Sequence, residues 1–202
     1  MPNPTRAVVL ISGGGSNLAA LLDAARDPGY GVEIVAVGAD RDCTGLALAA
    51  QAGVPTFMER VKDHPSREAW DSELTAQVAA HQPDLVISAG FLKLAGEAFL
   101  GEFGGRYLNT HNALLPAFPG IHGPRDALEY GVKITGATLF VVDAGIDTGV
   151  IVAQVAVPVL DGDDVDALTE RIKVAERDQL VEWVGRLGRE GFRVEGRRVV
   201  LG

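Results

Sequence analysis

The chain of 202 residues has one cysteine, a shortage of basic residues and no long apolar run. Because Cys43 stands alone, no disulfide can form within the chain, and a cysteine-based zinc cluster is excluded. The apolar runs fall short of the roughly 18 residues that a membrane span needs. The start of the chain, Met1–Arg6, is too polar for a signal peptide. We therefore expect a cytoplasmic protein that does not enter a membrane.

The chain has 18 Lys and Arg residues against 27 Asp and Glu residues, which gives a formal net charge of −9. A protein with this charge has no general attraction for nucleic-acid backbones or for anionic membranes. We therefore expect neither of them as a partner. A small anionic ligand would have to be held by a local site that acts against the overall field.

Glycine, by contrast, is abundant, with 25 residues. Many of these glycines directly follow apolar runs, which indicates tight turns between strands and helices. Hydrophobic residues make up 47% and charged residues 22%, as is usual for a folded protein. No repeat or linker is visible. The sequence predicts a single domain over residues 1–202, with a nucleotide-binding or phosphate-binding half (1–100) and a catalytic half (101–202).

Hydrophobic patterning predicts an α/β fold in which strands and helices alternate. The expected strands are 7–12, 32–37, 55–58, 85–89, 106–109, 138–142 and 150–159, and the expected helices are 18–25, 45–52, 66–81, 124–130 and 164–187. In helix 66–81, Trp70, Leu74 and Val78 repeat every four residues and predict a buried face. Such alternation favours a mostly parallel, twisted, Rossmann-like sheet with helices on both faces.

The last part of the chain departs from this alternation. Strands 138–142 and 150–159 are joined by a connection too short for a crossover helix, so we expect them to pair antiparallel. Residues 193–201 are expected to close a small hairpin around Glu195 and Gly196.

A glycine-rich loop, Ser12–Leu18, lies between the first strand and the first helix. Backbone N–H groups at a helix N-terminus bind anions, and glycine lets a phosphate approach closely. Leu18 stands where the dinucleotide fingerprint needs its third glycine, although Asp40 could still hold a ribose. A P-loop lysine is absent, and a nucleophile elbow would need glycine at position 18. A phosphate site and a plain turn both stay open.

Two further polar motifs follow predicted strands. Asn109 and His111 are two residues apart, so in an extended chain their side chains point to the same side. An amide beside an imidazole can polarise a carbonyl group and move a proton. Asp147 lies in the short loop Asp143–Gly149 and would favour a charged imidazole if it reached His111. Each motif could also be purely structural, the first as a polar strand end and the second as a turn.

Together these segments resemble the folate-dependent glycinamide ribonucleotide transformylases, also called phosphoribosylglycinamide formyltransferases. The resemblance covers essentially the whole chain. The stretches that carry it are Val9–Leu18, Ser66–Asp71, Ala89–Leu94, Leu108–His111, Leu114–Pro116, Phe118–Gly120 and Asp147–Gly149. It implies a single-domain enzyme of purine biosynthesis that transfers a formyl group from 10-formyltetrahydrofolate to the amine of glycinamide ribonucleotide, with no metal.

The resemblance also implies roles for individual residues. Asn109, His111 and Asp147 would be catalytic. The ribonucleotide would be held by Gly15, Ser16, Asn17, Lys173, Val174, Ala175 and Glu176. The folate would be held by Arg67, Leu92, Lys93, Leu94, Ala95, Asn109, Asp143, Ala144, Gly145, Ile146 and Asp147. The partners would be these two small molecules, and a homodimer is left open.

The sequence departs from the commonest pattern of this family in its pocket lining. Gly14 is often Asn, Asn112-Ala113 is more often Pro-Ser, Phe140 replaces a His seen in many relatives, and Thr148 is often Gly or Ala. Methionyl-tRNA formyltransferase and 10-formyltetrahydrofolate hydrolase share the Asn-His-Asp set, but the chain has no length for their additional domains. A nucleotide-dependent dehydrogenase and a non-enzymatic binding protein are the alternatives from other classes.

Overall fold

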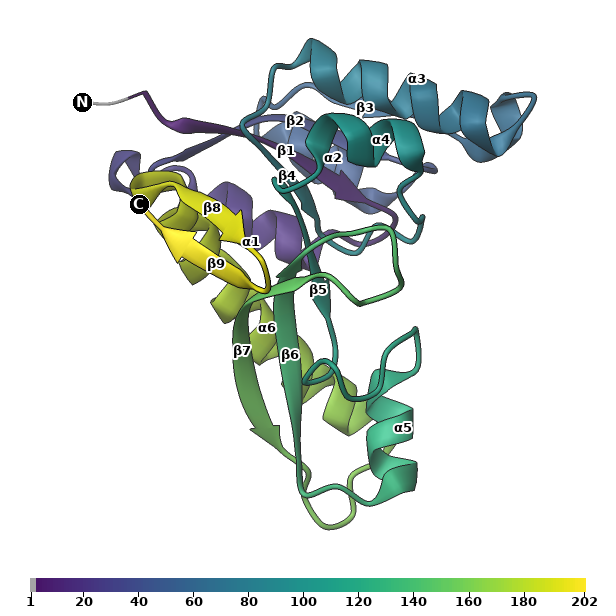
Figure 1. The fold of residues 1–202 in the computed structure, drawn as a ribbon, viewed down its shortest axis with the longest axis vertical. Helices are drawn as coiled ribbons and strands as arrows, with labels where there is room; N and C mark the ends of the chain where they lie inside the picture. The colour runs from purple at the N-terminus through teal and green to yellow at the C-terminus, as the bar shows by residue number, and fades with distance from the viewer. Residues whose placement is uncertain (1–2) are drawn as a thin grey trace.

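The computed structural model describes residues 3–202 and contains a seven-stranded sheet with strand order β3-β2-β1-β4-β5-β6-β7 (Figure 1). The strands are β1 (Thr5–Ile11), β2 (Val32–Ala39), β3 (Thr56–Met58), β4 (Leu85–Ser88), β5 (Tyr107–His111), β6 (Ile134–Val141) and β7 (Val150–Pro158). The strands from β3 to β5 are parallel, whereas β6 is antiparallel to both β5 and β7. The predicted fold class and the antiparallel β6–β7 pair are confirmed.

Helices cover both faces of this sheet. One face carries α1 (Ser16–Ala24), α2 (Thr44–Gln51) and α6 (Val165–Glu190), and the other carries α3 (Arg67–Ala80) and α4 (Glu97–Phe103). The remaining elements are α5 (Gly123–Tyr130), the short 3-10 helices η1 (Pro28–Tyr30) and η2 (Val61–Asp63), and the C-terminal hairpin β8 (Phe192–Glu195) with β9 (Arg198–Leu201).

The core is divided by the sheet into two main layers. Leu18 of α1 and Leu180 of α6 pack on one face of the strands, whereas the α3 residues Trp70, Leu74 and Val78 pack on the other. The exposed fraction of these three α3 side chains is 0%, 2% and 0%. Full burial of one such side chain stabilises the fold by roughly 1.5–3 kcal/mol. The predicted buried face of this helix is therefore confirmed.

The structure adds one helix to the sequence prediction and moves several element boundaries. Helix α4 was not expected, because it is short and contains Gly101; it forms because Phe99 and Phe103 are buried against the α3 layer. Strand β6 begins at Ile134, earlier than predicted, because its first residues pair with the end of β7. Strand β5 extends to His111, where it pairs with β6.

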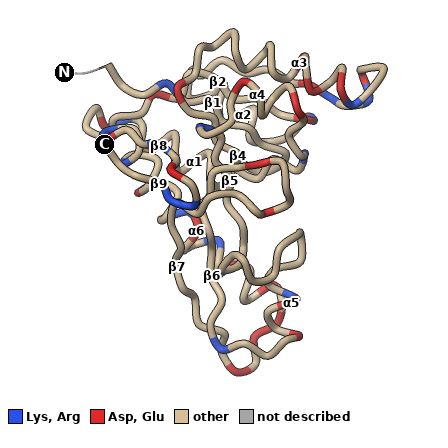
Figure 2. Tube along the Cα trace, viewed as in Figure 1, with Lys and Arg blue, Asp and Glu red and all other residues tan. Residues whose placement is uncertain are grey.

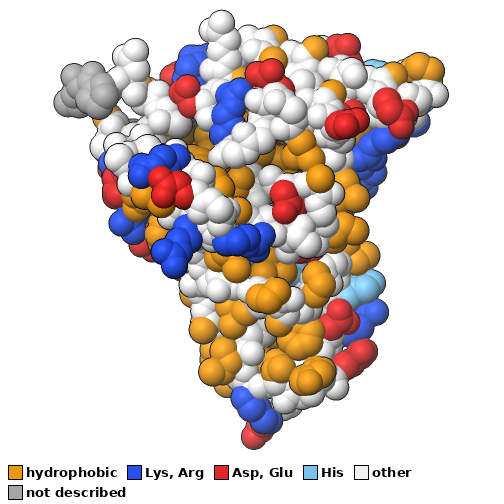
Figure 3. Space-filling view, viewed as in Figure 1, with side chains coloured by type: hydrophobic (Ala, Val, Ile, Leu, Met, Phe, Trp, Pro, Cys, Tyr) orange, Lys and Arg blue, Asp and Glu red, His pale blue; other side chains and the backbone are white. Residues whose placement is uncertain are grey.

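Charged positions lie mainly on helices and loops, while the main sheet carries few of them (Figure 2). Hydrophobic side chains gather on the surface over β6, β7 and α5 (Figure 3), where Tyr130 and Ile134 are 80% and 61% exposed. Within residues 3–202, no helix is both long enough and apolar enough to cross a membrane.

Candidate active site

Three of the predicted site segments follow the carboxyl ends of β1, β4 and β5 or lie at them. The chain order of the strands reverses between β1 and β4, which are neighbours in the sheet. In open α/β sheets, ligands bind outside the carboxyl ends of the strands at such a switch point. The loops that follow Ile11, Ser88 and His111 start at this edge. The topology therefore gathers the glycine loop, the predicted folate segment and the Asn109–His111 pair.

The glycine loop leads directly into α1. Gly15 is the N-cap of this helix, has φ +74° and offers no side-chain cap. The loop packs on the start of α2, where the Gly45 N–H donates to the Gly13 carbonyl at 3.2 Å. Gly13, Gly14 and Ser16 are exposed. Accessible backbone N–H groups at a helix start form a suitable anion site.

The structure disfavours a dinucleotide ribose at Asp40. This carboxylate is 5% exposed, lies 2.7 Å from Arg41 Nη2 and lies 3.5 Å from Lys93 Nζ. Burial opposes ionisation, but hydrogen bonds from Arg41 and Ser12 and the two positive charges outweigh it and lower the pKa of Asp40 below its ordinary 3.8. Asp40 therefore serves as the anionic partner of two cations, one of which, Lys93, belongs to the predicted folate segment.

Glu176 of α6 faces the glycine loop across the end of β5. Its Oε1 accepts hydrogen bonds from Asn17 Nδ2 at 2.7 Å and from Thr110 Oγ1 at 3.0 Å. Its Oε2 is buried and, among the described residues, has no hydrogen-bond partner. Burial raises the pKa of Glu176 above its ordinary 4.5, although both hydrogen bonds oppose this shift. The carboxyl group thus offers a free acceptor atom beside the predicted phosphate loop.

The other predicted α6 residues lie differently. Lys173 pairs with Glu170 at 2.7 Å, Val174 is 54% exposed, and Ala175 packs against the small apolar cluster around Leu168 and Ile172. Of the predicted segment 173–176, Glu176 is the member that hydrogen bonds connect to the glycine loop.

His111, at the end of β5, lies between two acceptors. Its Nε2 is 2.7 Å from the Phe118 carbonyl oxygen, and its Nδ1 is 3.6 Å from Asp147 Oδ2. The Asp147 carboxylate also accepts the Gly120 N–H at 2.7 Å. A doubly protonated imidazole can donate on both sides. The 3.6 Å separation is an ion-pair distance rather than a hydrogen bond, so an N–H at Nδ1 remains available to another acceptor.

Both loops that meet at His111 contain unusual backbone. Phe118 and Asp147 have φ of +53° and +55°, a region that side chains other than glycine rarely occupy. Such residues concentrate at functional sites, where the surrounding structure holds them. Within the Asp147 loop, Asp143 accepts hydrogen bonds from Gly145 N and Thr148 Oγ1, while Ala144 and Ile146 are exposed.

Asn109 lies on β5 between Ser88 of β4 and Phe140 of β6. It is two residues before His111, so the two side chains share one side of the strand. Phe140 is 2% exposed and places an apolar side chain next to Asn109.

The predicted folate segment, Leu92–Ala95, follows β4. Its Leu92 N–H donates to Ser12 Oγ at 2.8 Å, and Arg67 of α3 donates to the Leu94 carbonyl. The Arg67 guanidinium also lies 4.4 Å from the centre of the Trp70 ring. Leu92 and Leu94 are 68% and 63% exposed, so two apolar side chains on a hydrogen-bonded segment face solvent.

Sequence analysis missed four groups at this site. These groups hydrogen-bond to predicted residues or to the loop that follows β4. Ser12 accepts from Leu92 and Asp71 accepts from Gly96. Thr110 bonds to Glu176, and the Phe118 carbonyl bonds to His111. Ser12 had a signal, since it directly precedes the glycines. Within residues 3–202, no group of three or more His, Cys, Asp or Glu side chains is placed to hold a metal ion.

Comparison with known proteins adds to this geometry. Residues 5–184 match the formyl transferase family. The chain is 59% identical over 199 residues to phosphoribosylglycinamide formyltransferase of Mycobacterium tuberculosis, covering 98% of this chain and 92% of that protein. It is 40% identical over 170 residues to the Escherichia coli (strain K12) enzyme of the same name, covering 84% and 80%. The crystal structure of glycinamide ribonucleotide transformylase 1 from Symbiobacterium toebii superposes with a TM-score of 0.95 at 41% identity, covering 100% of this chain and 95% of that one.

Proposed function

Because this chain belongs to the formyl transferase family, we propose that it transfers the formyl group of 10-formyltetrahydrofolate to the amine of glycinamide ribonucleotide. The products are formylglycinamide ribonucleotide and tetrahydrofolate, in purine biosynthesis. The observation that carries the proposal is the meeting of two groups at the end of β5. There, Thr110 donates a hydrogen bond to Glu176, which also accepts one from Asn17, and the next residue in the chain, His111, faces Asp147.

The ribonucleotide is proposed to bind on the α1 and α6 side. Gly15, Ser16 and Asn17 would hold its phosphate at the start of α1, and residues 173–176 would line the rest of the subsite. Support comes from Glu176, whose buried Oε2 has no partner among the described residues and can accept a hydrogen bond from a substrate hydroxyl or N–H.

The folate is proposed to bind between residues 92–95 and the loop 143–147. The exposed side chains of Leu92, Leu94 and Ile146 offer apolar contacts to the rings and the benzoyl group. Arg67 and Lys93 supply positive charge toward the glutamate carboxylates of the folate. These two residues act locally, against the overall charge of −9.

The chemistry follows from the acceptor and donor positions. The amine nitrogen attacks the formyl carbon and forms a new C–N bond, so negative charge develops on the former carbonyl oxygen. Asn109 and the Nδ1 N–H of a protonated His111 would donate to this oxygen; one such donor is typically worth about 3 kcal/mol. Collapse of the tetrahedral intermediate breaks the bond to N10 of the folate, which takes up a proton.

Asp147 is proposed to stabilise the imidazolium of His111 by its negative charge and to place a water molecule that moves the proton. The amine loses one proton on attack, and N10 gains one on departure, so the transfer is balanced without an external acid. The position of the Asp147 carboxylate supports this role, because it lies 3.6 Å from His111 Nδ1 and accepts a hydrogen bond from the Gly120 N–H. Binding both substrates side by side supplies the proximity effect.

We further propose that residues 1–202 act as one domain in the cytoplasm, with these two small molecules as partners and without a metal. The decisive experiment measures deformylation of 10-formyl-5,8-dideazafolate spectroscopically, with and without glycinamide ribonucleotide. We expect strict dependence on the ribonucleotide. Equal release of formate without it would identify a hydrolase, and no reaction with both substrates would contradict formyl transfer altogether.

A further inference from the structure

The β4–α4 loop (residues 89–96) is held between Leu92 and Gly96 by hydrogen bonds at three points. Leu92 N–H bonds to Ser12, the Leu94 carbonyl bonds to Arg67, and Gly96 N–H bonds to Asp71 at 2.7 Å. Between these points Leu92 and Leu94 extend into solvent. Both Arg67 and Asp71 come from α3 and lie one helical turn apart, so one face of this helix supports the whole second half of the loop.

Asp71 is the buried member of this arrangement. It is 3% exposed, and its Oδ2 accepts hydrogen bonds from Ala98 N–H at 3.0 Å and Phe99 N–H at 3.2 Å, while its Oδ1 accepts the Gly96 N–H. Within residues 3–202, Asp71 forms no salt bridge. A buried carboxylate is costly unless it is hydrogen-bonded, so these backbone amides and the start of α4 compensate its charge.

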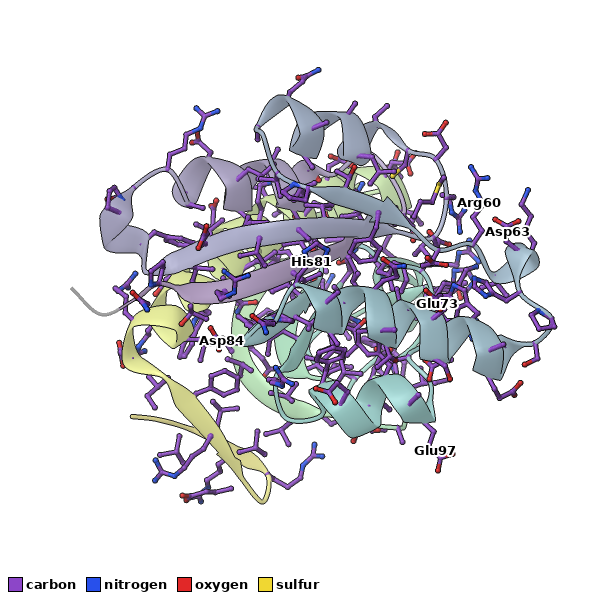
Figure 4. All side chains as sticks on the ribbon, turned by 90° about the horizontal axis from the view of Figure 1, so that it is seen from above. Arg60, Asp63, Glu73, His81, Asp84 and Glu97 are labelled. Carbon is purple, nitrogen blue, oxygen red and sulfur yellow. The ribbon has the colours of Figure 1, made fainter. Side chains whose placement is uncertain are left out.

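The contact also explains Gly96, the residue that ends the loop. Gly96 is the N-cap of α4 and has no capping side chain, so Asp71, which is 25 positions earlier, supplies the cap from α3. A Cβ at Gly96 would lie 2.5 Å from the Asp71 carboxylate. Figure 4 shows α3 and α4 side by side, with Glu97 marking the first residue of α4.

We propose that Asp71 is a positioning residue for the formyl donor, fixing the β4–α4 loop so that Leu92 and Leu94 present a preformed surface to the folate. This inference rests on the proposed function. The resemblance assigns a role only to Arg67 within the stretch Ser66–Asp71, and the proposal adds a role for Asp71. Asp71 does not touch the donor; it acts through the backbone of the loop.

The alternative is that Asp71 merely stabilises α4, whose Phe99 and Phe103 are core residues. The two roles differ in what they change. A purely structural cap alters the free energy of unfolding and leaves the folded site as it was. A positioning residue alters affinity for the donor while affinity for the ribonucleotide, which binds on the α1 and α6 side, stays constant.

The test compares the dissociation constants of 10-formyl-5,8-dideazafolate and of glycinamide ribonucleotide, by calorimetry, for wild type, Asp71→Asn and Val78→Ala. Asp71→Asn keeps one oxygen acceptor and loses the charge. We expect about tenfold weaker donor binding, the loss of roughly one charge-assisted hydrogen bond, with ribonucleotide binding and kcat within about twofold of wild type. Val78→Ala, on the same helix and fully buried, should lower Tm and leave both constants unchanged.

A second variant protects the test against misfolding. Gly96→Ala keeps the Asp71 residue, but the added Cβ displaces the Asp71 carboxylate from the loop. This variant should therefore also weaken donor binding selectively. Amide hydrogen exchange of residues 96, 98 and 99 should accelerate in both variants. Unchanged donor binding despite faster exchange, or equal losses for both ligands, would overturn the inference.

If wild type binds the donor but transfers no formyl group, the proposed function fails, while the binding comparison still decides on Asp71. If wild type does not bind the donor, both proposals fail.

Discussion

The imidazole of His111 has an acceptor near each of its ring nitrogens. One acceptor is a main-chain carbonyl at 2.7 Å, and the other is the Asp147 carboxylate at 3.6 Å. His111 is 8% exposed, so the orientation of its ring is fixed by these neighbours rather than by solvent. At 3.6 Å the Nδ1 atom makes no hydrogen bond to Asp147, so an N–H at this atom is available to a developing oxyanion, while the carboxylate places negative charge beside the ring.

We therefore expect His111→Ala and Asp147→Asn each to lower kcat at least about a hundredfold, the value of one oxyanion donor or its stabilising charge. Measurement of kcat under saturation with both substrates checks this. Circular dichroism and Tm should be close to wild type. His122→Ala is the matched control, because His122 is exposed and makes no capping hydrogen bond to α5. Near-normal turnover in either site variant would disprove these roles.

Part of this geometry could be predicted from the sequence. The two-residue spacing of Asn109 and His111 on a strand places both on one side. By the same alternation Thr110 points to the other side, but nothing nearby in the sequence marks its partner. That partner, Glu176, is 66 residues away on α6. Asp147 could be named as a candidate, whereas its distance from His111 depends on how two irregular loops meet, which local patterns do not determine.

Glu176 provides a prediction about pH. Burial raises its pKa above the ordinary 4.5, so the folded protein binds this proton more tightly than the unfolded chain does. The stability linked to the neutral acid is present below pH 4.5 and is lost as pH rises through the folded-state pKa. Glu176→Gln keeps the acceptor oxygen and removes this titration. Its Tm relative to wild type should therefore increase between pH 4 and pH 7.

The control for this experiment is Glu170→Gln, on the same helix. The hydrogen bond and charge of Lys173 lower the pKa of exposed Glu170, so its small contribution to stability is gained above the unfolded pKa. Its Tm relative to wild type should fall slightly over the same pH range. Parallel changes in both variants would indicate a general charge effect rather than burial of Glu176.

At the scale of elements, the junction between β1 and α1 combines two requirements on one glycine. Gly15 has φ +74°, and a Cβ there would lie 3.0 Å from Gly45 Cα of α2. Left-handed backbone costs a residue other than glycine roughly 1–2 kcal/mol. In addition, the contact between this Cβ and Gly45 would displace the loop whose N–H groups are proposed to hold the phosphate.

Gly15→Ala should therefore raise KM for the ribonucleotide at least about tenfold and lower the free energy of unfolding by more than the roughly 1–2 kcal/mol of the backbone alone. Gly53→Ala is a matched control, since Gly53 has φ +77° and open space around its Cβ position. It should show the backbone cost and an unchanged KM. Steady-state kinetics and urea unfolding measure both quantities. Equal stability losses with equal KM values would show that the contact with α2 is unimportant.

Elements with a strong local pattern could be predicted, and elements formed by distant contacts could not. Helix α3 has apolar residues every four positions and its own N-cap, Ser66, which accepts the Ala69 N–H. Helix α4 has seven residues and takes its cap from Asp71 of another helix. An isolated helix of this length is unstable in water. Its formation depends on the tertiary structure, which explains why the sequence pattern missed it.

At the scale of the whole molecule, the two halves named from the sequence, 1–100 and 101–202, share their core. Strand β4 of the first half pairs with β5 of the second. Leu180 and Val184 of α6 pack in the same apolar cluster as β1 and β2 residues. Neither half can bury its apolar surface without the other. We therefore expect one cooperative unfolding transition over the described chain.

Two tryptophans allow this expectation to be tested in each half. Trp70 is fully buried on α3, and Trp183 lies on α6, where Arg186 is 4.9 Å from its ring centre. In Trp183→Phe the fluorescence reports the first half, and in Trp70→Phe it reports the second.

Trp70→Phe also loses the hydrogen bond to the Glu59 carbonyl, so its midpoint should be lower. Within each variant, however, the urea midpoints by fluorescence and by far-UV circular dichroism should coincide. A fluorescence midpoint separated from the circular dichroism midpoint in either variant would mean that the halves unfold independently, because the probe would then follow only its own part of the sheet.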